Sequence, residues 1–298
     1  MCRVLKDAGI KIAPSTYYAR INHTPSNRDK RDEILMNYLN ALFTSNFYVY
    51  GARKLHALIN KDHHLASHGQ GHVARCTVER LMKKASIRGP VRRKHPNTTY
   101  TVKKEQCPAD LVDRNFHVPA PNMLWVADIT YVRTHVGWVY TAFITDAYSR
   151  RIVGWKVSAF MYTDLVVDTL TMAIDARCRA GQRIDQLIHH SDRGVQYRAI
   201  AYGQRLEENQ IIASVGSKGD SYDNALAEPV NSLYKGECIH NIDQHPAGFR
   251  HARDVEQATA AWVGWYNNDR LHSRLGNTSP VEYENAYWAS LNPVQTAA

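Results

Sequence analysis

Hydrophobic residues recur every three or four positions through the first third of the chain, which is the spacing of helices with one apolar face. This pattern predicts helices over residues 29–46, 52–60 and 76–87, the last of which ends before Gly89 and Pro90. We therefore expect residues 1–95 to be mainly helical.

The third of these helices carries basic side chains opposite its apolar stripe, at Arg80, Lys83 and Lys84. Three short helices with a basic last helix are typical of a helix-turn-helix domain, whose last helix enters the major groove of DNA. A small helical bundle with a solvated basic face fits the same pattern. The periodicity alone leaves both interpretations open.

From Leu124 onward the pattern changes to runs rich in Val, Ile, Thr, Tyr and Trp, which favour β-strands. Short connectors join the first three runs, as in an antiparallel meander. Two further strands alternate with helices, and a helical crossover brings the fourth strand back parallel to an earlier one. The resulting order predicts an α/β fold with a mixed five-stranded sheet flanked by helices. The expected strands are residues 124–134, 138–149, 151–158, 186–192 and 211–216, and the expected helices are residues 164–179, residues 197–210 and the segment that carries Glu228.

Capping residues mark two helix starts. Thr163 and Asp164 are expected to cap the helix that follows the third strand. Ser279, Pro280 and Glu282 form the pattern of a capping box and predict a final helix that extends through Trp288. Between the Glu228 segment and this capping box, residues 256–276 are expected to form a helix and its exit.

The net charge of +9 is unevenly distributed. Residues 1–118 hold 21 Lys and Arg against 9 Asp and Glu, whereas residues 119–298 hold 16 against 19. A basic front part on a nearly neutral back part indicates a module that binds a polyanion. Ordinary solubilising charge is the alternative explanation. Residues 93–118 mix Pro, Thr and basic residues without periodicity, which predicts a linker that lies on phosphate.

The composition excludes some classes of protein. No run of 18 apolar residues occurs, so we expect no membrane-spanning helix. The five cysteines are scattered, which suits a reducing cytoplasm. Residues 63–72 are rich in histidine, but Gly69 and Gly71 interrupt any helix that would align zinc ligands, so we expect a loop without zinc.

Three acidic residues stand out by position. Asp128 interrupts an apolar strand, where a carboxylate is costly unless it is paired or bound to metal. Asp192 directly follows another apolar strand, and Glu228 comes after a gap of 35 residues. Taken singly, each acid has a structural explanation. Taken together in a basic protein, they favour a metal site for phosphoryl transfer on DNA, and Asp192 would lie beside Asp128 if the fourth strand pairs with the first.

Carboxylates suit Mg²⁺, with Mn²⁺ as a substitute, and two such ions would stabilise the attacking and the leaving oxygen of an in-line displacement. Lys235 lies seven residues after Glu228, so on a helix both point the same way and the lysine could hold a DNA phosphate. His189 and His190 are expected to support the core rather than to act in the chemistry.

Four segments of the chain resemble, in order and spacing, the catalytic core of insertion-sequence-3 family transposases, which are relatives of retroviral integrases with a ribonuclease-H-like fold. Residues 53–59 and 74–89 resemble the helix-turn-helix segment of that family, so the resemblance covers nearly the whole chain. The four segments are WVADITYV, HHSDRGVQY, SVGSKGDSYDNALAEPVNSLYKGE and WYNNDRLHSRLGNTSPVEYE.

The resemblance implies that Asp128, Asp192 and Glu228 form the catalytic metal triad and that Lys235 contacts DNA. It implies cleavage of the ends of the element by water, followed by joining of the freed 3′-hydroxyl to target DNA. The expected partners are double-stranded DNA, as terminal inverted repeats and target, and further copies of the chain that pair the two ends. The resemblance also implies a bacterial protein of the cytoplasm that is associated with the nucleoid. Other residues expected to contact DNA are Arg193, Asn224, Arg80, Lys83, Lys84, Arg92, Arg93 and Lys94.

Three features depart from the family pattern. Pro229 stands where Ser or Thr is usual; because proline is tolerated in a first helical turn, Glu228 is expected near a helix start. The histidine-rich loop is longer than usual. The chain begins partway into the customary N-terminal segment, so recognition of the ends is expected to involve the upstream reading-frame product or a fusion with it.

The expected organisation is a helical DNA-binding domain over residues 1–92, a basic linker over 93–118, an integrase-type core over 119–285 and a tail over 286–298. The leading hypothesis is a metal-dependent DNA transposase. A non-catalytic DNA-binding remnant or regulator of the element is one alternative, and it predicts salt-sensitive binding without cleavage. A structure-selective nuclease on the same fold is the other.

Overall fold

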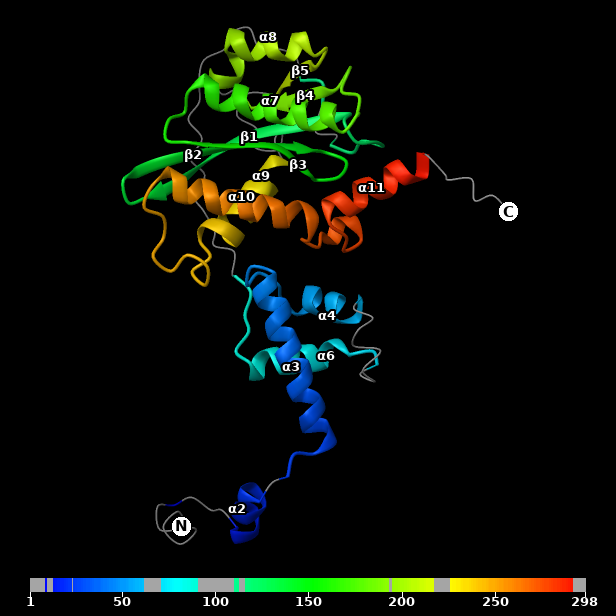
Figure 1. Ribbon diagram of the computed structural model, residues 1–298, viewed down its shortest axis with the longest axis vertical. Coiled ribbons are helices and arrows are strands. Elements are labelled where there is room, and N and C mark those ends of the chain that lie inside the picture. Colours follow the sequence, from blue (N-terminus) through cyan, green and yellow to red (C-terminus); the bar gives the residue numbers. More distant parts are fainter. Residues whose placement is uncertain are drawn as a thin grey trace, which may run out of the picture. The chain divides into compact units, whose positions relative to one another are not determined.

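The computed structural model describes residue 9 and residues 13–22, 24–61, 71–90, 110–112, 116–192, 195–216 and 226–291. The chain divides into two compact units (Figure 1). The first contains residues 1–44 and 55–87, and the second contains residues 45–54 and 88–298. Residues 45–54 therefore group with the second unit, although they fall inside the domain expected over residues 1–92.

The helices of the first part of the chain follow the predicted pattern. A short helix, α2 (Pro14–Ile21), precedes α3 (Asn27–Ser45), α4 (Ala52–Lys61) and α6 (Arg75–Lys84). The apolar stripes of the last three form a small buried core, whereas Ile34, expected on the inner side of α3, is 49% exposed. The core side chains are Leu35, Leu39, Leu55, Ile59, Val78 and Leu81.

The second unit contains the expected mixed sheet, with strand order β3-β2-β1-β4-β5. β1 pairs with β2 antiparallel and with β4 parallel, and β4 pairs with β5 parallel. The fourth strand thus lies next to the first. The strands are β1 (Leu124–Thr134), β2 (Gly137–Asp146), β3 (Ile152–Ser158), β4 (Ile188–Ser191) and β5 (Ile212–Val215).

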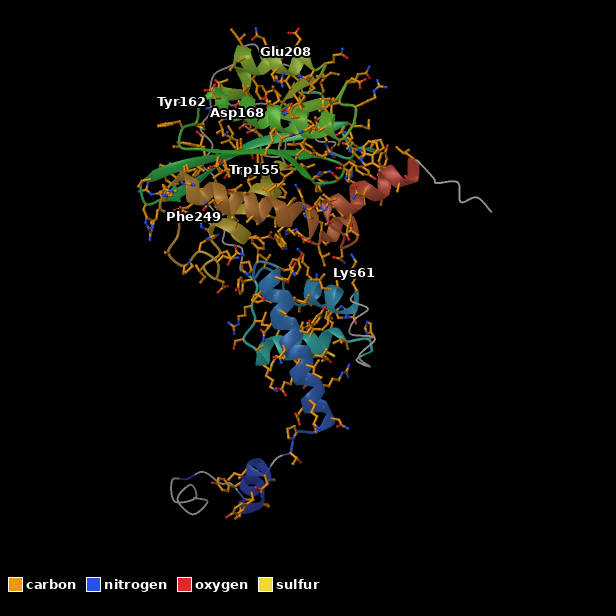
Figure 2. The ribbon with its side chains drawn as sticks, in the orientation of Figure 1. Lys61, Trp155, Tyr162, Asp168, Glu208 and Phe249 are labelled. Carbon is orange, nitrogen blue, oxygen red and sulfur yellow. The ribbon has the colours of Figure 1, made fainter. Side chains whose placement is uncertain are left out.

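Helices cover both faces of this sheet (Figure 1). On one face lie α7 (Thr163–Arg179) and α8 (Ile200–Glu208), and on the other lie α9 (Ala227–Tyr234) and α10 (Ala252–Asn268). Figure 2 shows Asp168 on α7 and Glu208 on α8, both on the same side of β3, the strand that contains Trp155. Because both faces are covered, β1 begins with a continuous buried run rather than an alternating one.

The buried run at the start of β1 divides between two clusters. Trp125 and Ala127 pack with Val166 and Leu170 of α7, in the cluster on one face of the sheet. Leu124 and Val126 belong to a second cluster with Leu226 and Phe116. Alternate residues of β1 therefore anchor opposite layers, and this double anchoring holds the strand that carries Asp128.

The ends of several elements differ from the prediction. Thr163 is the first residue of α7 and Tyr162 is its N-cap, without a side-chain capping bond, so the expected cap was wrong. The fourth strand spans only four residues, and the final helix, α11 (Pro280–Leu291), continues to Leu291 rather than ending at Trp288. The capping box is confirmed: Ser279 donates its backbone N–H to Glu282 Oε2 at 2.9 Å, and Glu282 donates to Ser279 Oγ at 3.2 Å.

A close approach between β3 and α7 depends on Gly154. A Cβ atom there would overlap the Thr169 carbonyl oxygen and lie 3.0 Å from Ala173 Cβ. We expect Gly154→Ala to lower the free energy of unfolding by about 1–3 kcal/mol, the usual result of overpacking. Gly203→Ala in α8 is the control, because its Cβ would meet nothing within 4 Å and alanine favours a helix by about 1 kcal/mol. Denaturant unfolding followed by tryptophan fluorescence measures both, and a Gly154→Ala protein as stable as the control would contradict the prediction.

Candidate active site

Asp128 occupies the first position of β1 beyond the pairing with β4. The parallel pairing covers Leu124–Ala127, whereas the pairing with β2 continues to Thr134. The Asp128 carboxylate is partly buried. It accepts a hydrogen bond from its neighbour's backbone, Ile129 N–H to Oδ1 at 2.9 Å, and one from the Asn231 amide to Oδ2 at 2.7 Å. Both oxygens of this acid are thus held in place.

Asp192 lies at the same level of the sheet. The register pairs Ala127 with Ser191, the residue before Asp192, in two strands that run in the same direction. The carboxyl ends of neighbouring parallel strands meet at one edge of a sheet, which is where open α/β sheets place their ligands. The expectation that Asp192 would lie beside Asp128 rested on β4 being the neighbour of β1, and this pairing is confirmed.

Glu228 stands in the first turn of α9 and is exposed, so Pro229 is accommodated near the helix start as expected. Tyr234, the last residue of α9, is fully buried and anchors the end of the helix. The Tyr234 ring lies 4.9 Å from that of Phe143, and its hydroxyl is 2.7 Å from Thr259 Oγ1. This anchor directs Asn231, three residues after Glu228, toward β1.

The three acids interact through their charges. The pKa of Asp128 is raised to about 7, first by burial and then by the charge of Asp192, with a smaller contribution from Glu228. The bonds from Ile129 and Asn231 act in the opposite direction. Ionising Asp128 is therefore harder than ionising an ordinary aspartate, and a nearby cation would favour its charged form. Across the residues that the structure describes, no three His, Cys, Asp or Glu side chains form a ready-made metal-binding group.

Two side chains near the acids were missed at the sequence level. Asn231 bonds to Asp128, and its spacing of three from Glu228 was the available signal, because residues three apart share a helix face. Tyr197 is buried in a short 3-10 turn, η1 (Val195–Arg198). Burial, the neighbouring Tyr202 and the charges of Asp192 and Asp128 raise its pKa well above the ordinary value. Nothing in the sequence pattern indicated Tyr197.

The two histidines of β4 are buried, and their contacts support the core role expected for them. His189 Nε2 lies 3.1 Å from the Tyr202 hydroxyl, and burial lowers the pKa of His189 to about 4. His190 Nδ1 lies 3.0 Å from Ser214 Oγ on β5. Both side chains thus connect β4 to its neighbours.

Lys235 follows α9 directly, at the start of a π-helical turn, η3 (Lys235–Ile239). Its Nζ atom lies 4.4 Å from the centre of the Tyr131 ring on β1. Asn231 and Lys235 therefore both face β1, one at Asp128 and the other three residues further along the strand. The contact of Lys235 with a DNA phosphate stays a prediction.

The basic residues of α6 differ in their surroundings. Lys83 and Lys84 are exposed in the last turn. Arg80, in contrast, donates two hydrogen bonds to Asp32 of α3, each 2.7 Å long, and the bond from Arg80 holds the pKa of Asp32 below its ordinary value. Its guanidinium group thus joins two helices of the first unit. Other residues expected on DNA or in the histidine-rich loop lie outside the described residues: Arg92, Arg93, Lys94, Arg193, Asn224 and residues 62–70.

The helices that the structure describes include none with the length and apolarity needed to span a membrane.

Two protein families match this chain. Residues 30–95 match the HTH-like domain, and residues 118–221 and 209–280 match two descriptions of the integrase core domain. The chain is 48% identical over 279 residues to the protein assigned as the transposase for insertion sequence element IS986/IS6110 in Mycobacterium tuberculosis, covering 93% of this chain and 96% of that protein.

Two further relatives extend this similarity. The transposase for insertion sequence element IS629 of Shigella sonnei is 43% identical over 294 residues, covering 97% of this chain and 93% of the relative. The transposase for insertion sequence IS3A of Escherichia coli is 31% identical over 293 residues, covering 96% and 93%. The HTH-like part, the ribonuclease-H-like integrase core and these relatives together show that the chain belongs to the IS3-type DDE transposases, polynucleotidyl transferases that act in DNA transposition.

Proposed function

We propose that this transposase cleaves the ends of its element and joins them to target DNA at a site formed by Asp128, Asp192 and Glu228, with Mg²⁺ bound to the three carboxylates. One observation carries the assignment: the parallel register of β1 and β4 brings Asp192 to the level of Asp128, where both charges interact. Asn231 connects the helix of Glu228 to the same point.

The chemistry of these groups fits a divalent cation. All three are carboxylates, the ligand type that Mg²⁺ prefers, and Mn²⁺ accepts the same set. Asp128 is difficult to ionise beside two other acids, and a cation would remove that difficulty. When bound, two such ions would stabilise the attacking and leaving oxygens of the displacement.

The side chains of the protein have separate roles in the proposed reaction. Asn231 donates to Asp128 and so fixes the orientation of that carboxylate. Lys235 holds a DNA phosphate next to the acids. Water breaks one phosphodiester bond and leaves a 3′-hydroxyl. This hydroxyl then attacks a phosphate of the target strand, forming a new phosphodiester bond and releasing the 3′-oxygen of the target strand.

The first unit supplies recognition of DNA in this proposal. Lys83 and Lys84 lie on the last helix of the three, the position of a recognition helix. We propose that residues 1–92 bind the terminal inverted repeats, that residues 93–118 follow the phosphate backbone, and that residues 119–285 contain the core, with a tail over 286–298. Copies of the chain on DNA would pair the two ends.

Replacing one acid tests the site. With labelled terminal-repeat DNA and Mg²⁺, we expect Asp192→Asn to reduce strand transfer by more than about a hundredfold, because even the outer partners of metal ligands contribute about 10–100-fold. Asp185→Asn is the matched control: it makes the same change at a surface aspartate that pairs with Arg183 before β4. Its activity should stay close to that of the unmodified protein.

The outcomes separate the proposal from its alternatives. Unchanged joining by Asp192→Asn would refute the assignment of the triad. Cutting of branched DNA without joining would identify a nuclease. Salt-sensitive binding of the ends without any metal-dependent cleavage would identify a non-catalytic DNA-binding protein.

A further inference from the structure

Two large aromatic side chains lie exposed on the β1–β2 hairpin near the acids. Tyr131 is 44% exposed and Trp138 is 48% exposed. Their rings meet edge to face, with centroids 5.2 Å apart and an interplanar angle of 84°. Each ring also has a cation over it: Lys235 Nζ is 4.4 Å from the Tyr131 centroid, and the Arg133 guanidinium is 5.2 Å from that of Trp138. We call these four side chains the aromatic patch.

The position of the patch connects it to the acids. Tyr131 lies three residues beyond Asp128 on β1, about 10 Å along the strand, and the alternation of side chains directs it to the other face from Asp128. Lys235 nevertheless reaches its ring from the end of α9. Lys235 lies one helical turn beyond Asn231, the residue that donates to Asp128. In the described part of the chain, no strand pairs with β1 from Asp128 onward on the side opposite β2 (Figure 1). A strand of DNA bound at the acids would pass around this edge of β1 to reach the patch.

Stabilisation of the hairpin explains only part of this arrangement. Cross-strand aromatic pairs make a modest contribution to the stability of a hairpin. Such a pair does not require two cations over two half-exposed rings beside a phosphodiester-cleaving site. Exposed rings next to Lys and Arg are, however, the combination with which proteins hold unpaired nucleotides: bases stack on the rings and phosphates pair with the cations.

We propose that the aromatic patch binds an unpaired nucleotide at the end of the DNA, with its base stacked on Tyr131 or Trp138 and its phosphate on Lys235 or Arg133. Holding this base out of the duplex brings the adjacent phosphodiester within reach of the acids. The inference rests on the proposed function, because it specifies that the DNA end bound for cleavage has an unpaired terminal nucleotide. Neither ring is part of the acid triad, so their loss leaves the chemical groups intact.

Substrates with paired and unpaired ends test the stacking site. The probe is a terminal-repeat duplex whose last base pairs are either complementary or mismatched. We expect Tyr131→Ala and Trp138→Ala each to lower cleavage of the complementary end about tenfold, the order of a lost base-stacking contact. The mismatched end, already unpaired, should recover most of the rate. Tyr131→Phe keeps a ring and should retain most of the activity.

A second measurement does not depend on turnover. The same duplex carries 5-iodouracil at its terminal positions, and irradiation should crosslink it to Tyr131 or Trp138, as mapped by mass spectrometry. Asp192→Asn should keep this crosslink while losing catalysis. Tyr287→Ala is the control, because Tyr287 is also a partly exposed tyrosine but lies on α11 against Tyr148. This variant should crosslink as the unmodified protein does.

The results distinguish the two proposals. If the unmodified protein joins ends while both alanine variants cleave and crosslink as it does, the stacking site is refuted and the triad assignment stands. If the patch variants change only the oligomeric state, the patch is a contact between copies of the chain and the stacking site is refuted. If the unmodified protein neither cleaves nor joins, the proposed function fails and this inference fails with it.

Discussion

Arg177→Met is expected to lower the free energy of unfolding of the second unit by at least about 3–5 kcal/mol, the loss found when one partner of a buried ion pair is removed. Arg177 is 2% exposed and donates to both oxygens of Glu284, which is fully buried. It also lies 3.3 Å from Asp146 Oδ2, and Asp146 is fully buried as well. The substitution leaves two buried carboxylates without this cation.

The titration of Glu284 supports this expectation. Burial acts to raise the pKa of Glu284, but the hydrogen bond from Arg177 and the charge of that residue hold it below the ordinary value. Without Arg177, Glu284 would keep only the partly exposed Arg151 as a cation, so its ionised form would be less favoured.

A matched control lies on the same helix. Arg179 is exposed and donates to the Asp175 carbonyl, so Arg179→Met should change the midpoint of thermal unfolding only slightly. The double variant Arg177→Met/Glu284→Gln should be more stable than Arg177→Met, because it removes a buried charge that only Arg151 would still pair with. Equal midpoints for Arg177→Met and Arg179→Met would show that the buried network contributes little.

Arg270→Ala is expected to have the second largest effect, again about 3–5 kcal/mol. Arg270 is 5% exposed and donates two hydrogen bonds to Glu237, one of them 2.7 Å long, and Glu237 is 6% exposed. Glu237 belongs to η3, two residues after Lys235. Loss of Arg270 should therefore destabilise the turn that positions Lys235, so that strand transfer falls together with stability.

Three variants test this pair. Arg274→Ala removes an exposed arginine of the same segment and should leave the unfolding midpoint nearly unchanged. Arg270→Lys keeps the charge but not the two-point contact and should be intermediate. Replacing Glu237 and Arg270 together by leucine should restore much of the stability, since apolar replacement of a whole buried pair is often neutral. A double variant as unstable as Arg270→Ala would argue against the ion pair as the cause.

The local pattern predicted what depends on local chemistry. The bounds of β1 match residues 124–134 because β-branched and aromatic residues fill that run and turn residues limit it. The helical crossover predicted that the fourth strand runs parallel to an earlier one but left open which one; the observed neighbour is β1, the arrangement that places Asp192 beside Asp128. The capping box at Ser279 was readable because both partners lie within one turn.

Contacts between distant residues were not predictable in this way. Arg177 and Glu284 are 107 positions apart, and each alone reads as a solvated charge on a helix. Arg80 has the spacing of a groove-facing residue, yet Asp32 of another helix engages it. The spacing of apolar residues also does not indicate the π-helical turn that begins at Lys235. These features depend on how the layers pack, which a single sequence does not contain.

Because β4 has only four residues, the alignment of Asp128 with Asp192 is sensitive to inserted or deleted residues. Two backbone ladders fix the height of Asp128 and Asp192 in the sheet, and no side-chain contact is needed for that alignment. Inserting or deleting a single residue upstream in β1 would shift Asp128 by about 3.3 Å and turn it to the other face. The alignment of the two acids therefore depends on the number of residues in each strand. Substitutions in β1 and β4 should preserve this alignment far better than insertions or deletions do.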